Sequence, residues 1–168
     1  MKKYFVSILM AMVAIVCVTT FTACGGDDDD VPGQEPGTVT FYEPCLEFGS
    51  SRDHVKDFMS GGTWQLMEES NEYVQMYSNS QNTTTVTYSF IGTGKGLTMS
   101  TVTYITYNAQ SIVAEVERRY KVTMKKDTDA TQPGDTVYGG QATINGRTIA
   151  IMVHCTSATA TVIYGRPD

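Results

Sequence analysis

The sequence has few basic residues and few histidines, and each shortage limits what the protein can do. Lysine and arginine together number 12, against 18 acidic residues in a chain of 168. Nucleic-acid binding requires a dense basic surface that releases counterions from phosphate, so this composition argues against a nucleic-acid partner. Only two histidines, His54 and His154, are available for catalysis or metal binding.

A hydrophobic run of membrane-spanning length is also missing. The run at residues 4–18 has 15 residues, whereas a spanning helix needs about 20. It follows Lys2 and Lys3 and precedes small and polar residues, as in a secretory signal peptide. We expect residues 1–23 to be that signal peptide, with a retained membrane anchor as the alternative. Their removal takes away two lysines and no acids, which leaves 10 basic and 18 acidic residues and a net charge of −8.

The rest of the chain divides into a tether and a domain. Residues 25–40 contain four glycines, two prolines and five acids, with almost nothing to bury. We therefore expect residues 24–40 to form a flexible acidic tether. Aromatic and β-branched residues begin at Phe41, and residues 41–168 are enough for one hydrophobic core, so we expect a single globular domain.

Two segments have helical patterns. Residues 51–59 follow Ser50, whose hydroxyl is a suitable N-cap, and Asp53 favours the positive end of the helix dipole; glycines 61 and 62 end the pattern. A second helix is expected after Asn108, because the apolar residues fall on one helical face. These residues are Ala109, Ile112, Val113, Val116 and Tyr120.

Alternating apolar and polar residues predict strands through most of the remainder. The predicted strands are residues 64–67, 73–77, 85–90, 97–107, 141–144, 147–153 and 159–164. Asn145 and Gly146 form a primed hairpin turn, and residues 127–134 form a polar loop. The order is helix, about four strands, helix, about four strands. It predicts an α+β fold with an antiparallel sheet and two short helices packed on one face. An internal duplication stays open, because no motif recurs at a fixed offset.

Neither a phosphate-binding loop nor a metal site is indicated. The stretch FIGTGKGLT places Lys95 among glycines, but Ser89 stands where a P-loop needs its first glycine and Gly96 where it needs serine or threonine, so we expect a hairpin turn. The consecutive carboxylates of residues 27–30 do not form a preformed oxygen cage. We expect no metal and no cofactor.

A catalytic site would have to use His54, His154 or Cys155. The pairs Asp53–His54 and His154–Cys155 are adjacent in sequence, and adjacent side chains point apart on a helix or strand. We therefore expect no catalytic residue.

Two cysteines, Cys45 and Cys155, remain in the domain. A disulfide between them would close a loop of roughly a hundred residues and contribute about 4 kcal/mol in the chain-entropy model. The alternative is two separate buried thiols.

Tyrosine is frequent, with ten residues in the chain. Tyr73, Tyr77, Tyr104 and Tyr107 lie in predicted strands. Tyrosines fill the cores of β-rich domains, and exposed members of this set would form a binding face.

The residues Phe21-Thr22-Ala23-Cys24 resemble the lipobox of bacterial lipoproteins, with Phe21 in place of the usual leucine. This resemblance implies cleavage before Cys24 and attachment of diacylglycerol to its sulfur, with an added amide-linked acyl chain such as palmitate. Two or more acyl chains hold a protein firmly on a bilayer.

Cys24, two glycines and Asp27 to Asp30 resemble the N-terminus of Bacteroidota lipoproteins, in which the acids are an export signal. This implies an outer-membrane lipoprotein at the cell surface, with the periplasmic face as the alternative. Asp135-Thr136-Val137 is similar to the O-glycosylation sequon of the same phylum, which implies a glycan on Thr136.

Gly49-Ser50-Ser51 followed by Val55, Phe58 and Met59 is similar in outline to small lipoprotein domains of the β-lactamase-inhibitor-like and outer-membrane-assembly type. Those domains pack a capped helix on a sheet and bind other proteins. We therefore expect a non-catalytic lipoprotein domain that binds a protein or glycan partner. The alternatives are a small envelope hydrolase and a structural envelope-assembly or fimbrial component.

Overall fold

The computed structural model describes residues 40–92, 94, 96–106, 108–130 and 134–167. The predictions for residues 1–39, including the signal peptide, the lipidated Cys24 and the acidic tether, lie outside the described residues, as does Tyr107. The described residues up to Arg166 belong to one compact unit.

Both predicted helices are present. Helix α2 (Arg52–Ser60) ends at Gly61 as expected, but its N-cap is Ser51, whose hydroxyl accepts from the His54 amide at 3.2 Å. The predicted cap, Ser50, instead donates its hydroxyl to the carbonyl of Glu47. Helix α3 (Ala109–Tyr120) matches the predicted residues and ends at Lys121, which has the left-handed conformation.

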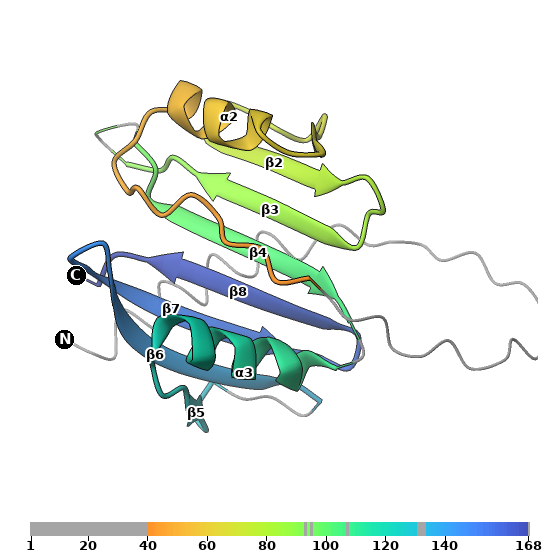
Figure 1. Ribbon diagram of the computed structural model, residues 1–168, viewed down its shortest axis with the longest axis vertical. Helices are drawn as coiled ribbons and strands as arrows, with labels where there is room; N and C mark the ends of the chain where they lie inside the picture. The colour runs from red at the N-terminus through yellow and green to blue at the C-terminus, as the bar shows by residue number, and fades with distance from the viewer. Residues whose placement is uncertain (1–39, 93, 95, 107, 131–133, 168) are drawn as a thin grey trace, which may run out of the picture. The chain divides into compact units, whose positions relative to one another are not determined.

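Eight strands form one antiparallel sheet (Figure 1) in the order β1-β2-β3-β4-β8-β7-β6-β5. They are β1 (Trp64–Leu66), β2 (Val74–Asn79), β3 (Thr84–Ser89), β4 (Met99–Ile105), β5 (Lys125–Asp127), β6 (Thr136–Ile144), β7 (Arg147–Cys155) and β8 (Thr159–Gly165). The α+β class and the antiparallel sheet are therefore confirmed. Strand β5 was missed because Lys125-Lys126-Asp127 has no β-branched residue and little apolar alternation. Strand β6 begins five residues before its predicted start because Gly139 and Gly140 interrupt the pattern.

The fold consists of two copies of one structural unit. Each half consists of a helix followed by four strands, and the strand order is the same from either edge to the central β4–β8 pair. One register row across the sheet is palindromic, with a tyrosine at each end and four valines between. The row is Tyr77, Val86, Val102, Val162, Val153 and Tyr138. The four valines are 0% exposed. Because the strand order and this row are symmetric about the Val102–Val162 pair, an approximate twofold axis relates the two halves between β4 and β8.

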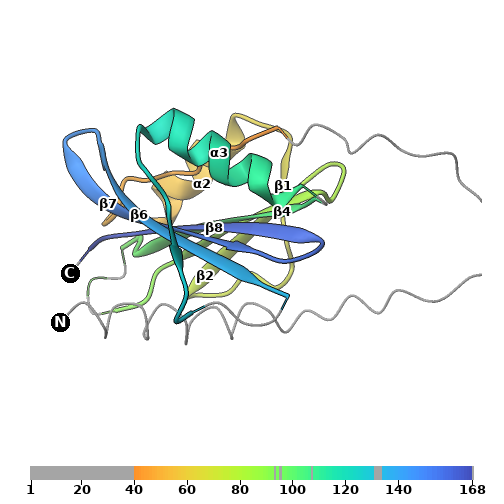
Figure 2. The same cartoon turned by 90° about the horizontal axis from the view of Figure 1, so that it is seen from below.

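The side chains of this row lie on one face of the sheet. Tyr88 lies on the same face, because it is two residues from Val86 on β3, and we call this face the Tyr88 face. Helix α2 contacts it where the hydroxyl of Tyr88 donates to the Met59 sulfur at 3.2 Å. Helix α3 packs on β6, β7 and β8. Figure 2 shows α3 lying along one side of the sheet.

Residues 40–48, here called the strap, precede α2 and run over the sheet beside β4 (orange in Figure 1). Cys45 and Phe48 are 2% and 4% exposed. At its end the Gly49 amide donates to the Leu97 carbonyl, and the Leu97 amide donates to the Ser50 carbonyl, both at 2.8 Å. The strap therefore belongs to the folded domain.

Candidate functional site

His154 forms a histidine–carboxylate pair of the kind that enzymes use. On β7, its Nε2 lies 3.0 Å from Oδ2 of Asp135, which precedes β6. The hydroxyl nearest in register is that of Thr161. The Thr161 hydroxyl is hydrogen-bonded to the hydroxyl of Thr103 at 3.2 Å. Asp135 therefore orients the His154 imidazole beside a hydroxyl that already has another partner.

The other two candidate catalytic residues lie elsewhere. Cys155 is next to His154 on the strand and therefore points to the opposite face, where its thiol is 3.9 Å from the Ala109 carbonyl oxygen. Burial raises the pKa of this thiol, which reduces its thiolate fraction. His54 is on α2 and pairs with Glu47 at 3.2 Å. The fold thus separates His54, His154 and Cys155.

Cys45 and Cys155 are both free and buried. The Cys45 carbonyl accepts from the Ser100 hydroxyl at 2.6 Å, which places Cys45 near the start of β4. By register, Cys155 lies about 13 Å along β4 from Ser100 and about 10 Å across the sheet. Because the Cα atoms of a disulfide lie within about 7 Å of each other, the structure agrees with two separate thiols and does not form the bridge.

The expected glycosylation site lies at the start of β6. Thr136 is half-buried and is the register partner of Cys155. The neighbouring Asp135 is held by His154.

The described tyrosines of the expected binding face divide into two kinds. Tyr77 and Tyr104 are 4% and 0% exposed and belong to the core, as tyrosines in β-rich domains commonly do. Tyr73 is 57% exposed, immediately before β2.

The site that the sequence did not reveal is the surface beneath the strap. The Tyr104 hydroxyl accepts from the Tyr42 amide at 3.0 Å and donates to the Tyr42 carbonyl at 3.1 Å. The Cys45 amide donates to the Tyr88 hydroxyl at 3.1 Å. Together with the Ser100 contact, hydroxyl groups satisfy both backbone groups of two strap residues.

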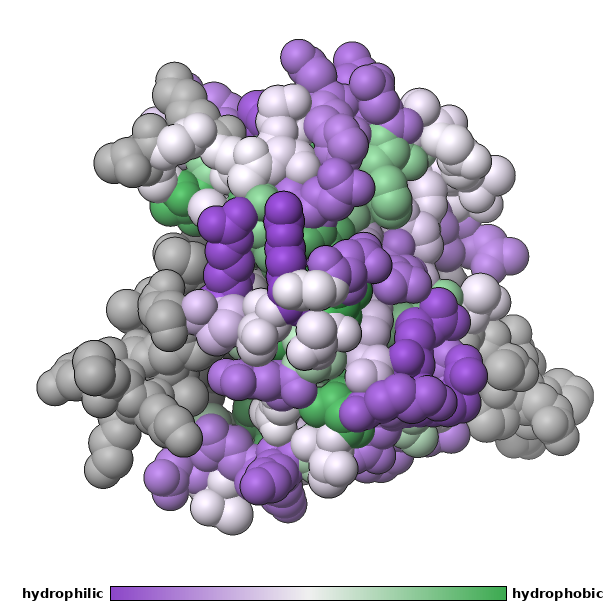
Figure 3. Space-filling view, turned by 60° about the vertical axis from the view of Figure 1, so that its left-hand side comes forward, coloured by the Kyte–Doolittle hydropathy of each residue, from purple (hydrophilic) through white to green (hydrophobic). Residues whose placement is uncertain are grey.

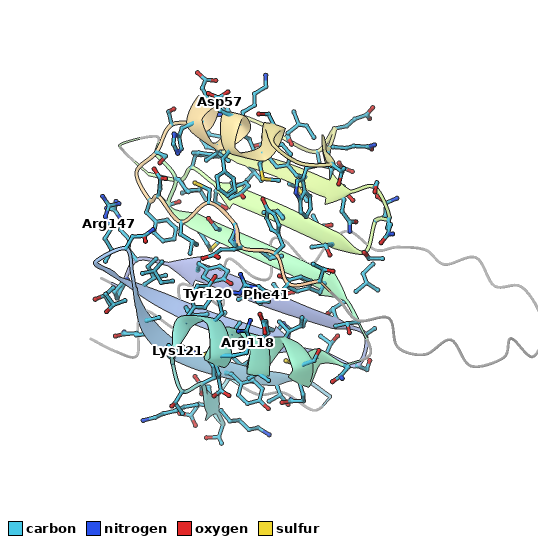
Figure 4. The ribbon with its side chains drawn as sticks, in the orientation of Figure 1. Phe41, Asp57, Arg118, Tyr120, Lys121 and Arg147 are labelled. Carbon is cyan, nitrogen blue, oxygen red and sulfur yellow. The ribbon has the colours of Figure 1, made fainter. Side chains whose placement is uncertain are left out.

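Aromatic rings complete this surface. The Phe41 ring lies 6.0 Å from that of Tyr104 and 6.4 Å from that of Tyr120, and Figure 4 shows Phe41 and Tyr120 side by side above the sheet. The Tyr42 ring lies 4.4 Å from Trp64. We call the residues that contact the strap the strap-binding surface; they are Met59, Trp64, Tyr88, Ser100, Tyr104, Arg119 and Tyr120.

Arg119 connects the strap to α3. Its guanidinium lies 4.8 Å above the Phe41 ring and contacts Glu43 at 3.4 Å and Glu115 at 3.1 Å. Glu115 also accepts from Arg118, and hydrogen bonds from Arg118 and then Arg119 lower the pKa of Glu115 to about 2. The carboxylate stays ionised and holds Arg119 in place.

This surface can bind a backbone but is poorly suited to acid–base chemistry. Burial raises the pKa of both Tyr88 and Tyr104 far above the ordinary value, so their hydroxyls stay neutral and act as hydrogen-bond donors and acceptors. No sequence pattern indicates this surface, because the bonded partners are 43 to 62 residues apart and each tyrosine alone fits an ordinary core strand.

Other predicted features keep a structural role. The glycine-rich stretch lies between the antiparallel strands β3 and β4, with Gly92 at φ +121°, and it leads into a strand; Thr93 and Lys95 lie outside the described residues. Within the described ranges, no three His, Cys, Asp or Glu residues are grouped to hold a metal ion.

On the face shown in Figure 3, hydrophilic side chains predominate and hydrophobic atoms show in small areas between them. Neither described helix has the length and hydrophobicity that crossing a membrane requires. Comparison with models of protein families, with curated proteins and with solved structures finds no significant match to this chain.

Proposed function

We propose that the protein is an outer-membrane lipoprotein at the cell surface, anchored through Cys24, whose domain binds a protein or glycan partner without catalysing a reaction. The observation that carries the binding function is the strap-binding surface, where side-chain hydroxyls from the sheet engage the backbone of an extended segment. The strap begins where the expected tether ends, so the tether would pull on a segment that is bonded to the middle of the sheet.

The separation of His54, His154 and Cys155 supports the non-catalytic part of the proposal. A nucleophile, its base and an orienting acid must lie within hydrogen-bond reach of one another. Cys155 and His154 point to opposite faces, and His54 pairs with a different acid. These positions do not favour the hydrolase alternative.

The edge strands give little support to a fimbrial or strand-exchange role. Strands β1 and β5 each contain three residues, and β5 carries Lys125 and Lys126. Short and charged edges hinder pairing with another chain.

We also propose that both helices form one layer on the Tyr88 face. The contact of Met59 with Tyr88 and that of Tyr120 with Tyr164 support this arrangement, because Tyr88 and Tyr164 share a face by register. Nuclear Overhauser effects from Met59 to the Tyr88 ring and from Tyr120 to the Tyr164 ring would be expected. Effects from Met59 to Thr101, on the other face, would contradict it.

Replacement of Cys24 tests the anchor. In Cys24→Ala, the protein should move from the membrane fraction to the soluble fraction and lose incorporation of a labelled fatty acid, because acyl chains supply the membrane affinity. Ser80→Ala, a substitution at an exposed turn, is the matched control and should remain in the membrane fraction. Unchanged membrane partitioning of Cys24→Ala would refute the anchor. Added protease should cleave the protein on intact cells if it lies at the cell surface.

A further inference from the structure

The strap is held through hydrogen bonds to its backbone as well as through buried side chains. At Tyr42 one hydroxyl, that of Tyr104, bonds both the amide and the carbonyl. At Cys45 the Tyr88 hydroxyl accepts from the amide and the Ser100 hydroxyl donates to the carbonyl. Every residue has a backbone carbonyl and every residue except proline has an amide N–H, so these contacts suit any extended segment without proline at the two bonded positions.

The side chains of the strap add selectivity. Phe41 contacts the rings of Tyr104 and Tyr120, and Tyr42 contacts Trp64. Cys45, three residues further on, is 2% exposed and leaves room only for a small side chain. The surface therefore accepts two adjacent aromatic residues, then an exposed residue beside Arg119, and then two buried residues, here Pro44 and Cys45.

We propose that the strap-binding surface is a peptide-binding site that the strap occupies within its own chain, and that an extended segment of a partner protein with this side-chain pattern replaces the strap. This inference rests on the proposed function, because it names the class of protein partner and the place where it binds. Main-chain hydrogen bonds supply affinity and the side-chain positions supply specificity, as in other complexes with extended peptides.

Because the strap belongs to the same chain, it competes strongly with a free peptide for the strap-binding surface. A segment joined to its site by a short connection has an effective concentration of roughly millimolar. A free peptide should therefore bind the unchanged protein weakly and bind much more tightly once the strap's own contacts are weakened. The Arg119 contacts with Phe41 and Glu43 are part of what a partner must displace.

The test uses a fluorescent peptide of residues 40–48 and the purified full chain, with anisotropy as the measurement. The double variant Phe41→Ala, Tyr42→Ala weakens the strap and should bind the peptide at least about tenfold more tightly than the unchanged chain. A peptide carrying the same two substitutions is the control and should lose most of its binding. Adding Ser100→Ala to the double variant should weaken peptide binding by about fivefold, because one backbone hydrogen bond is lost.

A milder variant tests the same inference if the double variant does not fold. Glu43→Ala removes an exposed contact with Arg119 and should raise peptide affinity by about twofold to threefold. The inference is overturned if a variant with native near-ultraviolet circular dichroism does not bind the peptide, or binds the control peptide equally well. Such a failure would leave the partitioning of Cys24→Ala unchanged, so it is distinguishable from failure of the membrane anchor.

Discussion

The hydroxyl of Tyr104 forms two hydrogen bonds with the backbone of Tyr42, which lies 62 residues earlier in the chain. It accepts from the Tyr42 amide and donates to the Tyr42 carbonyl. One buried side chain on β4 therefore satisfies both main-chain groups of a strap residue. The strap lies outside the sheet's hydrogen-bond ladder, so contacts of this kind take the place of strand pairing.

Tyr104→Phe tests the energetic value of that contact. Removing the hydroxyl leaves the Tyr42 amide and carbonyl without this partner, and we expect the free energy of unfolding to fall by about 1–3 kcal/mol. Urea denaturation followed by circular dichroism measures the change. Tyr73→Phe, at an exposed tyrosine, should change stability by less than about 0.5 kcal/mol. Equal effects of the two substitutions would show that the contact contributes little.

Val102→Ala tests the central valine row. Val102 is 0% exposed and is the register partner of Val162 at the approximate twofold axis. Loss of two buried methyl groups leaves a cavity between β4 and its neighbours, with an expected cost of about 2–3 kcal/mol. Thr148→Ala, at an exposed position of β7, should cost less than about 0.5 kcal/mol. A loss below about 1 kcal/mol for Val102→Ala would show that the row tolerates a cavity.

Local patterns were sufficient for the helices and most strands. The apolar face from Ala109 to Tyr120 gave α3 its observed bounds. At α2 the prediction of Ser50 as the N-cap was wrong, because the Ser50 hydroxyl donates to the Glu47 carbonyl in the preceding turn and the Ser51 hydroxyl accepts from the His54 amide. The repeated helix and four strands are visible in the topology but not in a motif, because the separation in sequence between Tyr77 and Tyr138 differs from that between Val86 and Val153.

The strap-binding surface could not be predicted from the sequence for a different reason. Alternation showed that Tyr88 and Tyr104 lie in strands, but it could not show which buried hydroxyl meets a backbone group. Residues 40–48 also have neither helical nor strand periodicity. Cys45 and Cys155 illustrate the same limit, since their separation depends on strand order.

Alkylation of the protein tests the state of the two domain cysteines. Both thiols are buried and free, so we expect native protein to leave the Cys45 and Cys155 peptides unlabelled. After unfolding in denaturant without reductant, each peptide should carry one label, as mass spectrometry would show. Recovery of a linked peptide containing both cysteines would contradict the separate thiols.

Glu115 should titrate unusually low. Hydrogen bonds from Arg118 and Arg119 lower the pKa of its carboxyl group from the ordinary 4.5 to about 2. Because the folded pKa is lowered, the contribution of this group to stability is present above about pH 4.5 and is lost as the pH falls through about 2. Carbon-13 titration by NMR measures the midpoint, and Arg118→Gln should move it upward. An unchanged midpoint in that variant would show that Arg118 is not the main cause of the lowered pKa of Glu115.

The buried tyrosines should make the fold sensitive to alkali. Burial raises the pKa of Tyr120 from the ordinary 10.0 to about 12, and burial also raises the pKa of Tyr88, Tyr104 and Tyr164. A raised folded pKa means that the neutral tyrosines stabilise the fold fully below pH 10.0, and that this stability is lost as the pH rises from 10.0 through about 12. Tyrosinate absorbance at about 295 nm should therefore rise together with loss of the near-ultraviolet circular dichroism signal, because the buried rings ionise when the sheet opens. Ionisation of all the tyrosines near pH 10.0 with the dichroism signal intact would show that these hydroxyls are accessible in the folded protein, and would also weaken the assignment of Tyr88 and Tyr104 as neutral partners of the strap backbone.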